Sequence, residues 1–177
     1  MTSPGREPVV YVGGDDGFGT PLRRDTIMRI ASISKPIVTA AALSMVDTAF
    51  HVPPDKLHRF VPQLAPGEDG LALFDPVDGM WASAPQFPLS SAGLVSTIDD
   101  LIAFTDRLRD GRLISTTSLS AMTTDHLTPQ QRDDAGLFLD GAGWGYGLCV
   151  EPDGRYGWDG GLGTGWRVAG RSAHRRR

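Results

Sequence analysis

The stretch Ser32-Ile33-Ser34-Lys35-Pro36 opens an apolar run and decides how the rest of the chain is interpreted. Of the 17 basic residues, only Lys35 and Lys56 are lysines, and all others are arginines. A desolvated ammonium can release its proton, whereas a guanidinium in a protein effectively cannot. In a helix, the three-residue spacing places the Ser32 hydroxyl and the Lys35 amine on one face, one turn apart. That arrangement is typical of a serine nucleophile activated by a lysine.

The Ser-x-x-Lys spacing also has a plain structural interpretation. At average residue usage, a chain of this length contains such a tetrapeptide by chance about once. In that interpretation, Ser32 only caps a helix and Lys35 is a solvated residue of its first turn. The tetrapeptide therefore needs support from the rest of the chain.

The composition is that of a globular protein with one hydrophobic core. The 177 residues are 40% hydrophobic and 21% charged, which favours a single domain over 1–177. The net charge of −4 gives no nucleic-acid signal, and the basic tail 171–177 is interpreted as a solvated terminus. Cys149 is the only cysteine, so no internal disulfide is expected.

Neither membrane insertion nor export is expected from the sequence. No apolar window is long enough to span a bilayer. The first residues lack a charged-then-apolar signal pattern, so the expected location is cytoplasmic by default.

Hydrophobic periodicity and turn residues predict an α+β fold. Thr97 is expected to cap a helix that Gly111 ends, with Asp100 completing a capping box and a buried stripe of Leu101, Ile102, Phe104 and Leu108. Glu151–Gly154 and Gly160–Gly161 are predicted turns of an antiparallel meander. Helices are expected over 31–46, 97–111 and 116–123, with a further helix from 128 and one short helical turn within the loop 51–63. Strands are expected over 8–12, 71–74, 80–84, 144–150, 155–158 and 162–168. A hairpin turn is expected at 75–79.

The block 24–36 resembles the active-site entry of the serine β-lactamase superfamily. The closest branch comprises the class C-like β-lactamases, the related esterases and the D,D-peptidases. Segments similar to the same family follow in the same order at 50–57, 91–100, 122–127 and 157–164. The resemblance implies a β-lactamase/transpeptidase-like fold, in which helices flank an antiparallel sheet.

The resemblance also implies roles for individual residues. Ser32 matches the nucleophile that an ester or β-lactam carbonyl acylates, and Lys35 matches the residue that helps to take its proton. Trp158-Asp159-Gly160 occupies the place of the family's Lys/His-Thr-Gly strand motif. The backbone N–H groups of Ser32 and Gly161 would form the oxyanion hole. A small-molecule acyl substrate is implied, with no cofactor and no metal.

The chain departs from the family in three respects. The family's second motif contains a tyrosine between the Ser-Lys helix and the strand motif. Here Tyr11 lies before Ser32, Tyr146 and Tyr156 lie in the last predicted strands, and none is followed two positions later by asparagine, which the chain lacks. The helical subdomain of the family is largely missing, with an apparent deletion seam at 44–47. The chain also ends soon after Trp166, where the family continues into a further strand and helix.

Two functions remain open from the sequence. The first is a serine hydrolase that acts on ester or amide acyl substrates through an acyl-serine intermediate. Trp158 favours an esterase, because a carboxylate-bearing antibiotic would lose a cationic partner there. The alternative is a catalytically impaired remnant that acts at most as a binding or interaction protein, since the tyrosine is absent.

Other chemistries have little support in the sequence. There is no Gly-x-Ser-x-Gly nucleophile elbow. The four histidines are scattered and lack the spacing of metal ligands. The glycines after residue 140 alternate with aromatic residues inside strand patterns, which indicates packing rather than a phosphate loop.

Overall fold

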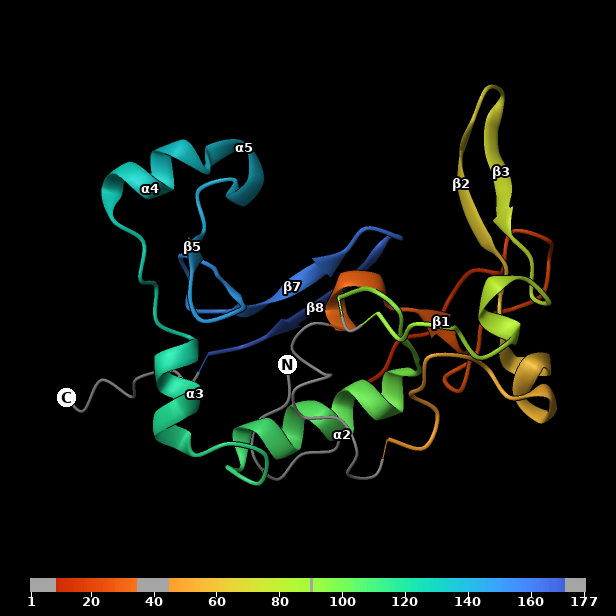
Figure 1. The fold of residues 1–177 in the computed structure, drawn as a ribbon, viewed down its shortest axis with the longest axis horizontal. Coiled ribbons are helices and arrows are strands. Elements are labelled where there is room, and N and C mark those ends of the chain that lie inside the picture. Colours follow the sequence, from red (N-terminus) through yellow and green to blue (C-terminus); the bar gives the residue numbers. More distant parts are fainter. Residues whose placement is uncertain (1–8, 35–44, 90, 171–177) are drawn as a thin grey trace.

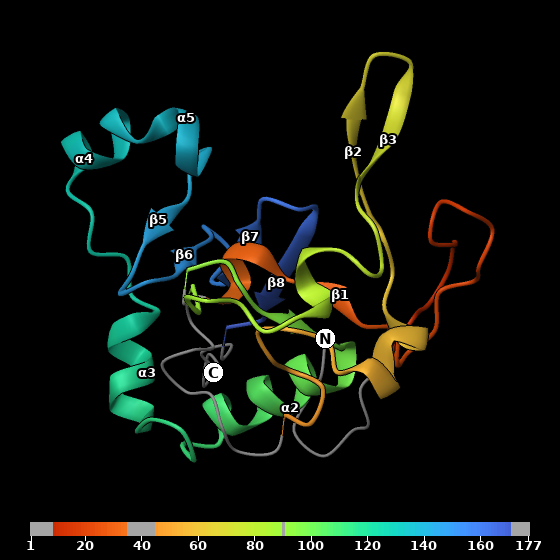
Figure 2. The same cartoon turned by 45° about the vertical axis from the view of Figure 1, so that its right-hand side comes forward.

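The computed structural model describes residues 9–34, 45–89 and 91–170 of the chain, and all strand pairs in this part are antiparallel except one isolated bridge. The main sheet has four strands in the order β5-β6-β7-β8 (Figures 1 and 2; β6 is labelled in Figure 2). The meander predicted for the end of the chain is confirmed. The strands are β5 (Gly143–Trp144), β6 (Cys149–Val150), β7 (Tyr156–Gly160) and β8 (Thr164–Val168).

The core lies between this sheet and helix α2 (Ile98–Arg109). Phe104 and Leu108 of α2 are buried together with Trp166 and Val168 of β8, and the Phe104 and Trp166 rings lie 5.4 Å apart. Leu101 packs against the same cluster while remaining partly exposed. The predicted helix is therefore present. Phe104 and Leu108 of its expected stripe are buried, whereas Leu101 and Ile102 are only partly buried. The α+β class is confirmed.

The N-terminus of α2 differs from the prediction in one detail. The Thr97 side chain accepts a hydrogen bond from the Asp100 backbone N–H at 3.3 Å, as expected for an N-cap. The Asp100 carboxylate, however, does not close a capping box. It accepts hydrogen bonds from the Asp47 backbone N–H at 2.8 Å and the Thr48 hydroxyl at 2.7 Å. The helix start thus also anchors a distant loop.

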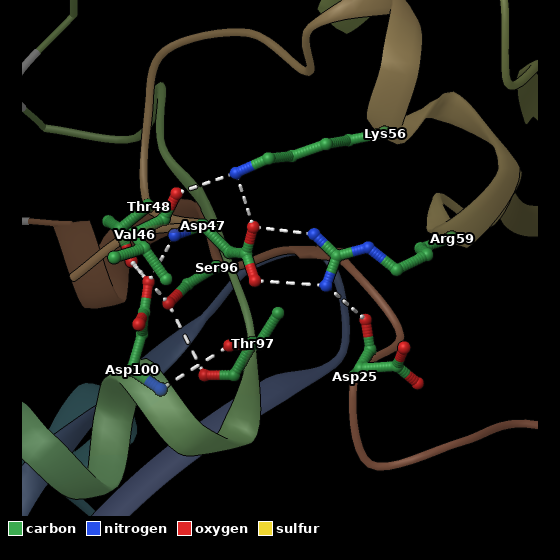
Figure 3. Close-up of polar contacts among 9 residues, drawn as sticks. All are labelled: Asp25, Val46, Asp47, Thr48, Lys56, Arg59, Ser96, Thr97 and Asp100. Carbon is green, nitrogen blue, oxygen red and sulfur yellow. Dashed lines mark hydrogen bonds and ion pairs between the residues drawn. The ribbon is translucent and has the colours of Figure 1, made fainter.

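The segment that follows the predicted seam is held by a charged cluster (Figure 3). Asp47 accepts hydrogen bonds from Lys56 at 2.7 Å and from Arg59 at 2.5 and 2.9 Å. Both cations belong to the 3-10 helix η2 (Pro54–Arg59), which is the short helical turn expected in this loop. The hydrogen bonds from Arg59 lower the pKa of Asp47 from 3.8 to about 2. Partial burial opposes this shift, and the hydrogen bond from Lys56 adds to it.

The Asp47 cluster predicts an acid-dependent loss of stability. Because the pKa of Asp47 is lowered in the folded state, its ionised carboxylate contributes to the free energy of unfolding. This contribution is fully present above about pH 4 and disappears as the pH falls through about 2. We expect Asp47→Asn to reduce the free energy of unfolding at neutral pH by up to about 2 kcal/mol and to flatten its decline in acid. Urea unfolding across this pH range measures both effects. Asp110→Asn, which breaks an exposed pair with Arg112, should leave the pH profile unchanged.

A buried ion pair joins the strand before Ser32 to a hairpin. Arg29 in β1 (Met28–Arg29) pairs with the Asp75 carboxylate, and the two side chains are 1% and 4% exposed. The guanidinium also donates to the Val61 carbonyl at 2.7 Å and lies over the rings of Phe60 and Trp81. β1 in turn pairs with β4 (Val95–Ser96). Burial lowers the Arg29 pKa, and Asp75 opposes this effect.

The predicted hairpin around Asp75 is wrong. The strand over 71–74 exists within β3 (Gly70–Asp75), but it pairs with β2 (Gln63–Gly67), and residues 80–82 form the 3-10 helix η3 (Met80–Ala82). Asp75 is buried against Arg29 and accepts a hydrogen bond from the Met80 N–H at 2.9 Å, so it is not a solvated turn residue. The β2–β3 hairpin stands away from the rest of the molecule in both views (Figures 1 and 2).

Three other expected elements also differ. Residues 9–12 form no strand, and Val9 and Tyr11 are strongly exposed. The helix expected over 31–46 begins as the 3-10 turn η1 (Ala31–Ile33), and most of its expected range lies outside the described residues. At the expected end of that helix, Val46 and Asp47 form a turn. The strand expected over 144–150 is split into β5 and β6 by a tight turn in which Gly147 has φ +79°.

The segment between α2 and the sheet forms an arm of short helices. These are α3 (Thr116–Met122), α4 (Pro129–Asp134) and α5 (Gly136–Leu139), which include the two expected helices at 116–123 and from 128. In Figure 2, α4 and α5 lie on the other side of the molecule from the β2–β3 hairpin. Asp125 fixes the arm to β5, because it pairs with Arg132 of α4 and accepts a hydrogen bond from the Trp144 N–H at 3.1 Å.

Candidate active site

The largest cavity near the sequence-predicted residues has a volume of about 740 Å³ and lies between η1, β7 and α5. Ser32 and the run Trp158–Gly161 line the same cavity, although they are more than 120 residues apart in the sequence. Phe138, Asp140 and Trp144 line it from the arm and from β5. The structure therefore brings the predicted nucleophile and the predicted strand motif together.

Ser32 lies in a turn that is fixed on both sides. Before it, the Ile30 N–H donates to the Leu94 carbonyl at 3.1 Å; after it, the Leu94 N–H donates to the Ser34 hydroxyl at 3.1 Å. Ala31, immediately before Ser32, has φ +43°, which is unfavourable for a residue with a Cβ. A strained backbone held by its neighbours is a common feature of functional sites, because the strain presents a side chain in a fixed direction.

The turn and β7 are in close contact at a glycine. A Cβ on Gly160 would lie 2.7 Å from the Ile30 carbonyl oxygen and would also overlap the Thr164 hydroxyl. The Thr164 hydroxyl itself donates to the same carbonyl at 3.3 Å. Only glycine permits this approach, so the sequence at 160 determines how near the Ser32 turn lies to the strand.

Gly160→Ala should therefore displace the Ser32 turn from β7. We expect the rate of Ser32 acylation by an activated ester to fall by about 10-fold or more, because small displacements of reacting groups are costly. Gly13→Ala is the matched control, since a Cβ at 13 meets no atom within 4 Å and Gly13 does not line the cavity. Pseudo-first-order rates of acylation measure the difference. Equal rates for the two variants would contradict the close contact.

Three aromatic rings form one wall of the cavity. The Trp144 and Trp158 centroids lie 4.6 Å apart in an edge-to-face arrangement, and Phe138 lies 5.1 Å from Trp158 and 6.4 Å from Trp144. The three come from β5, β7 and α5, so the arm supplies part of the site. Phe138 remains 69% exposed, and Trp144 and Trp158 are half-buried.

The charged groups of the cavity are mostly acidic. Arg167 donates to Glu151 at 2.9 Å and to Asp159 at 2.7 Å. Partial burial acts to lower the Arg167 pKa, but these hydrogen bonds outweigh it and hold that pKa above its ordinary value. Asp140 also lines the cavity, and the described residues give its carboxylate no cationic partner.

Cys149 lines the same cavity but is a poor nucleophile. The side chain is buried, and burial raises the pKa of its thiol above the ordinary value of 9.0. The positive charge of Arg167 opposes this rise, whereas the negative charges of Glu151 and Asp159 add to it. The reactive form of cysteine is the thiolate, so the thiol stays unreactive near neutral pH. Among the described residues that line the cavity, Ser32 is therefore the nucleophile with the strongest structural support.

The remaining predicted positions fall into two groups. Lys35 lies outside the described residues, so its distance from Ser32 stays a prediction. All three tyrosines are described, and none lines this cavity: Tyr156 is in the core, Tyr146 stacks on His126, and Tyr11 lies near α2. The site thus has no tyrosine in the position that the family's second motif would supply.

Sequence reasoning did not assign Phe138, Asp140, Glu151 and Arg167 to the site, and further lining residues were also not assigned to it. Arg167 could have been found from its place in β8, the strand that pairs with the motif strand β7, where it lies opposite Gly157. Phe138 and Asp140 had no such signal, because they depend on the position of the arm.

Among the described residues, no group of three His, Cys, Asp or Glu side chains could hold a metal ion, and no helix is long and apolar enough to cross a membrane.

Comparisons with known proteins agree with this architecture. Esterase EstB of Burkholderia gladioli is 30% identical over 143 residues, which are 77% of this chain and 33% of the esterase. A variant of the simvastatin synthase of Aspergillus terreus superimposes with a TM-score of 0.61 at 17% identity, covering 73% of this chain and 39% of that one. The D-amino acid amidase of Ochrobactrum anthropi gives 0.56 at 16% identity, covering 91% and 77%. Both structural matches show the fold alone.

The chain is short relative to its curated relatives, since it spans 23% to 33% of the length of those it matches. The sequence pattern of the Beta-lactamase family matches residues 43–172. That match starts next to the predicted seam at 44–47 and leaves Ser32 and Lys35 before it. The internal deletion therefore stays a prediction. Since the family pattern covers well over half of the chain, the protein belongs to the Beta-lactamase family.

Proposed function

We propose that this protein is an acyl-serine hydrolase with Ser32 as its nucleophile, acting on esters in preference to β-lactams. The observation that carries the proposal is that Ser32 and the strand motif Trp158–Gly161 line one cavity. The 30% identity to an esterase over most of the chain supports the same reaction class. Trp158 offers no positive charge to a substrate carboxylate, which supports the preference for esters over carboxylate-bearing β-lactams.

In the proposed reaction, the Ser32 Oγ attacks the carbonyl carbon of the ester and its proton passes to the Lys35 amine. The resulting oxyanion accepts hydrogen bonds from the backbone N–H groups of Ser32 and Gly161. The carbon–oxygen bond to the alcohol then breaks, and the alcohol leaves with the proton from Lys35. Water reverses these steps on the acyl-serine and releases the acid.

The absence of a tyrosine from the cavity makes the proposed hydrolysis slow. General acid–base catalysis by one positioned group typically contributes a factor of about 10² to 10⁴. We expect this loss to slow the release of the acyl group more than its arrival from an activated ester, because attack by water needs a general base whereas a p-nitrophenolate leaving group needs no general acid. With such an ester the acyl-serine should therefore accumulate, with a burst of alcohol followed by slow turnover.

Labelling with a fluorophosphonate tests the proposal. Intact mass should show one adduct per chain, and peptide mapping should place it on Ser32. Cys149→Ala should label normally, because its thiol is protonated and is not the proposed nucleophile. A protein that gains no adduct, or an adduct elsewhere, would be a catalytically impaired member of the family that acts at most by binding.

A further inference from the structure

The aromatic wall of the cavity presents ring surface beside the candidate nucleophile. Phe138 is 69% exposed although its ring contacts that of Trp158, and both residues line the cavity together with Ser32. Aromatic faces carry partial negative charge and attract cations, most strongly for tryptophan. A ligand that occupies this cavity beside Ser32 therefore has these ring surfaces within the same cavity.

The charge of the lining points to the same ligand class. The described lining contains the three carboxylates of Asp140, Glu151 and Asp159 and a single guanidinium, Arg167. Arg167 is already bonded to Glu151 and Asp159, so it is not available to an anionic substrate. Adding the ammonium expected at Lys35 would still leave an acidic balance. Asp140 and Asp159 are exposed, so solvent and salt screen part of their attraction for a cation, and the acidic balance still disfavours an anion.

We propose that the cavity selects acyl substrates that carry an ammonium group near the reacting carbonyl, such as choline-like esters or amides of amino-bearing acids. The ammonium lies against the aromatic wall near Asp140, and a carboxylate in the same place is repelled. The inference deepens the proposed function and rests on it for the identity of the reacting atoms. The binding preference itself requires no reaction at Ser32.

Binding of three molecules of similar size tests the inference. Choline carries a trimethylammonium, and 3,3-dimethylbutan-1-ol carries a neutral tert-butyl group in its place. In 3,3-dimethylbutanoate the tert-butyl group is kept and a carboxylate replaces the CH2OH group, so it tests whether the cavity accepts an anion. Because Trp144 and Trp158 line the cavity, quenching of tryptophan fluorescence at matched ionic strength reports binding. We expect choline to bind about threefold or more tightly than the neutral alcohol, and the carboxylate to bind most weakly.

Variants assign the preference to the cavity. Trp158→Leu keeps an apolar side chain without an aromatic face, and we expect it to remove most of the advantage of choline. Asp140→Asn should reduce that advantage about twofold, and about 1 M salt should reduce the remaining electrostatic part by screening. Asp110→Asn is the matched control, since Asp110 is exposed and does not line the cavity. Its affinities should equal those of the parent.

The outcomes separate this inference from the proposed function. Choline and the neutral alcohol binding equally, or neither binding, would overturn the inference. If Ser32 is labelled by a fluorophosphonate but choline shows no advantage, the hydrolase proposal stands and the ligand class is wrong. If choline is preferred and no adduct forms, the ligand class stands and the hydrolase proposal fails.

Discussion

Arg29→Met should destabilise the protein by about 3–5 kcal/mol, since it leaves the Asp75 carboxylate buried without its cation. The substitution also removes the hydrogen bond to the Val61 carbonyl at 2.7 Å and the stacking on Phe60. A loss of this size is a large part of the total stability of a typical domain. Urea unfolding followed by circular dichroism measures it.

Arg24→Met provides the matched control, because it also removes an arginine from an ion pair with an aspartate. The side chains of Arg24 and Asp99 are 50% and 52% exposed, and such pairs contribute about 0–1 kcal/mol. Arg29→Lys keeps the charge without the fork of donors and should be intermediate. If Arg29→Met and Arg24→Met were equally stable, the Arg29 pair would not hold β1 in place.

Ser32→Ala should abolish the ester-dependent burst and reduce hydrolysis by about 10³-fold or more, down to the background rate. The physical reason is that, among the described residues that line the cavity, Cys149 is the only other hydroxyl or thiol, and its thiol is buried with a raised pKa. Release of p-nitrophenol from a short p-nitrophenyl ester measures both phases of the reaction.

Ser120→Ala serves as the control for Ser32→Ala. Ser120 is exposed and does not line the cavity, so its replacement should leave the burst and the turnover unchanged. A Ser32→Ala protein that hydrolyses the ester as fast as the parent would show that the nucleophile lies elsewhere.

The sequence predicted the elements whose signals are local. The Thr97 cap and the apolar spacing that follows it identify α2, and the alternation of glycine and aromatic residues identifies the meander. The resemblance to the family associated Ser32 with Trp158–Gly161 before the structure placed them at one cavity. Such signals depend on neighbouring residues, so one sequence is enough to read them.

Other features depend on contacts between distant residues and could not be predicted locally. Asp75 has the surroundings of a turn residue, but its partner Arg29 lies 46 positions earlier, and this pairing buries it. Asp100 is placed correctly for a capping box, yet Asp47 and Thr48 occupy its carboxylate. Phe138 reaches the cavity because Asp125 ties the arm to β5, which no local pattern reveals.

The crystal structure of the protein after fluorophosphonate treatment tests the central claim most directly. The account predicts a phosphorus bonded to the Ser32 Oγ, with a phosphoryl oxygen about 3 Å from the N–H groups of Ser32 and Gly161. The Lys35 amine should lie within hydrogen-bond distance of the Oγ. An adduct on another residue, or a phosphoryl oxygen directed away from Gly161, would contradict the account.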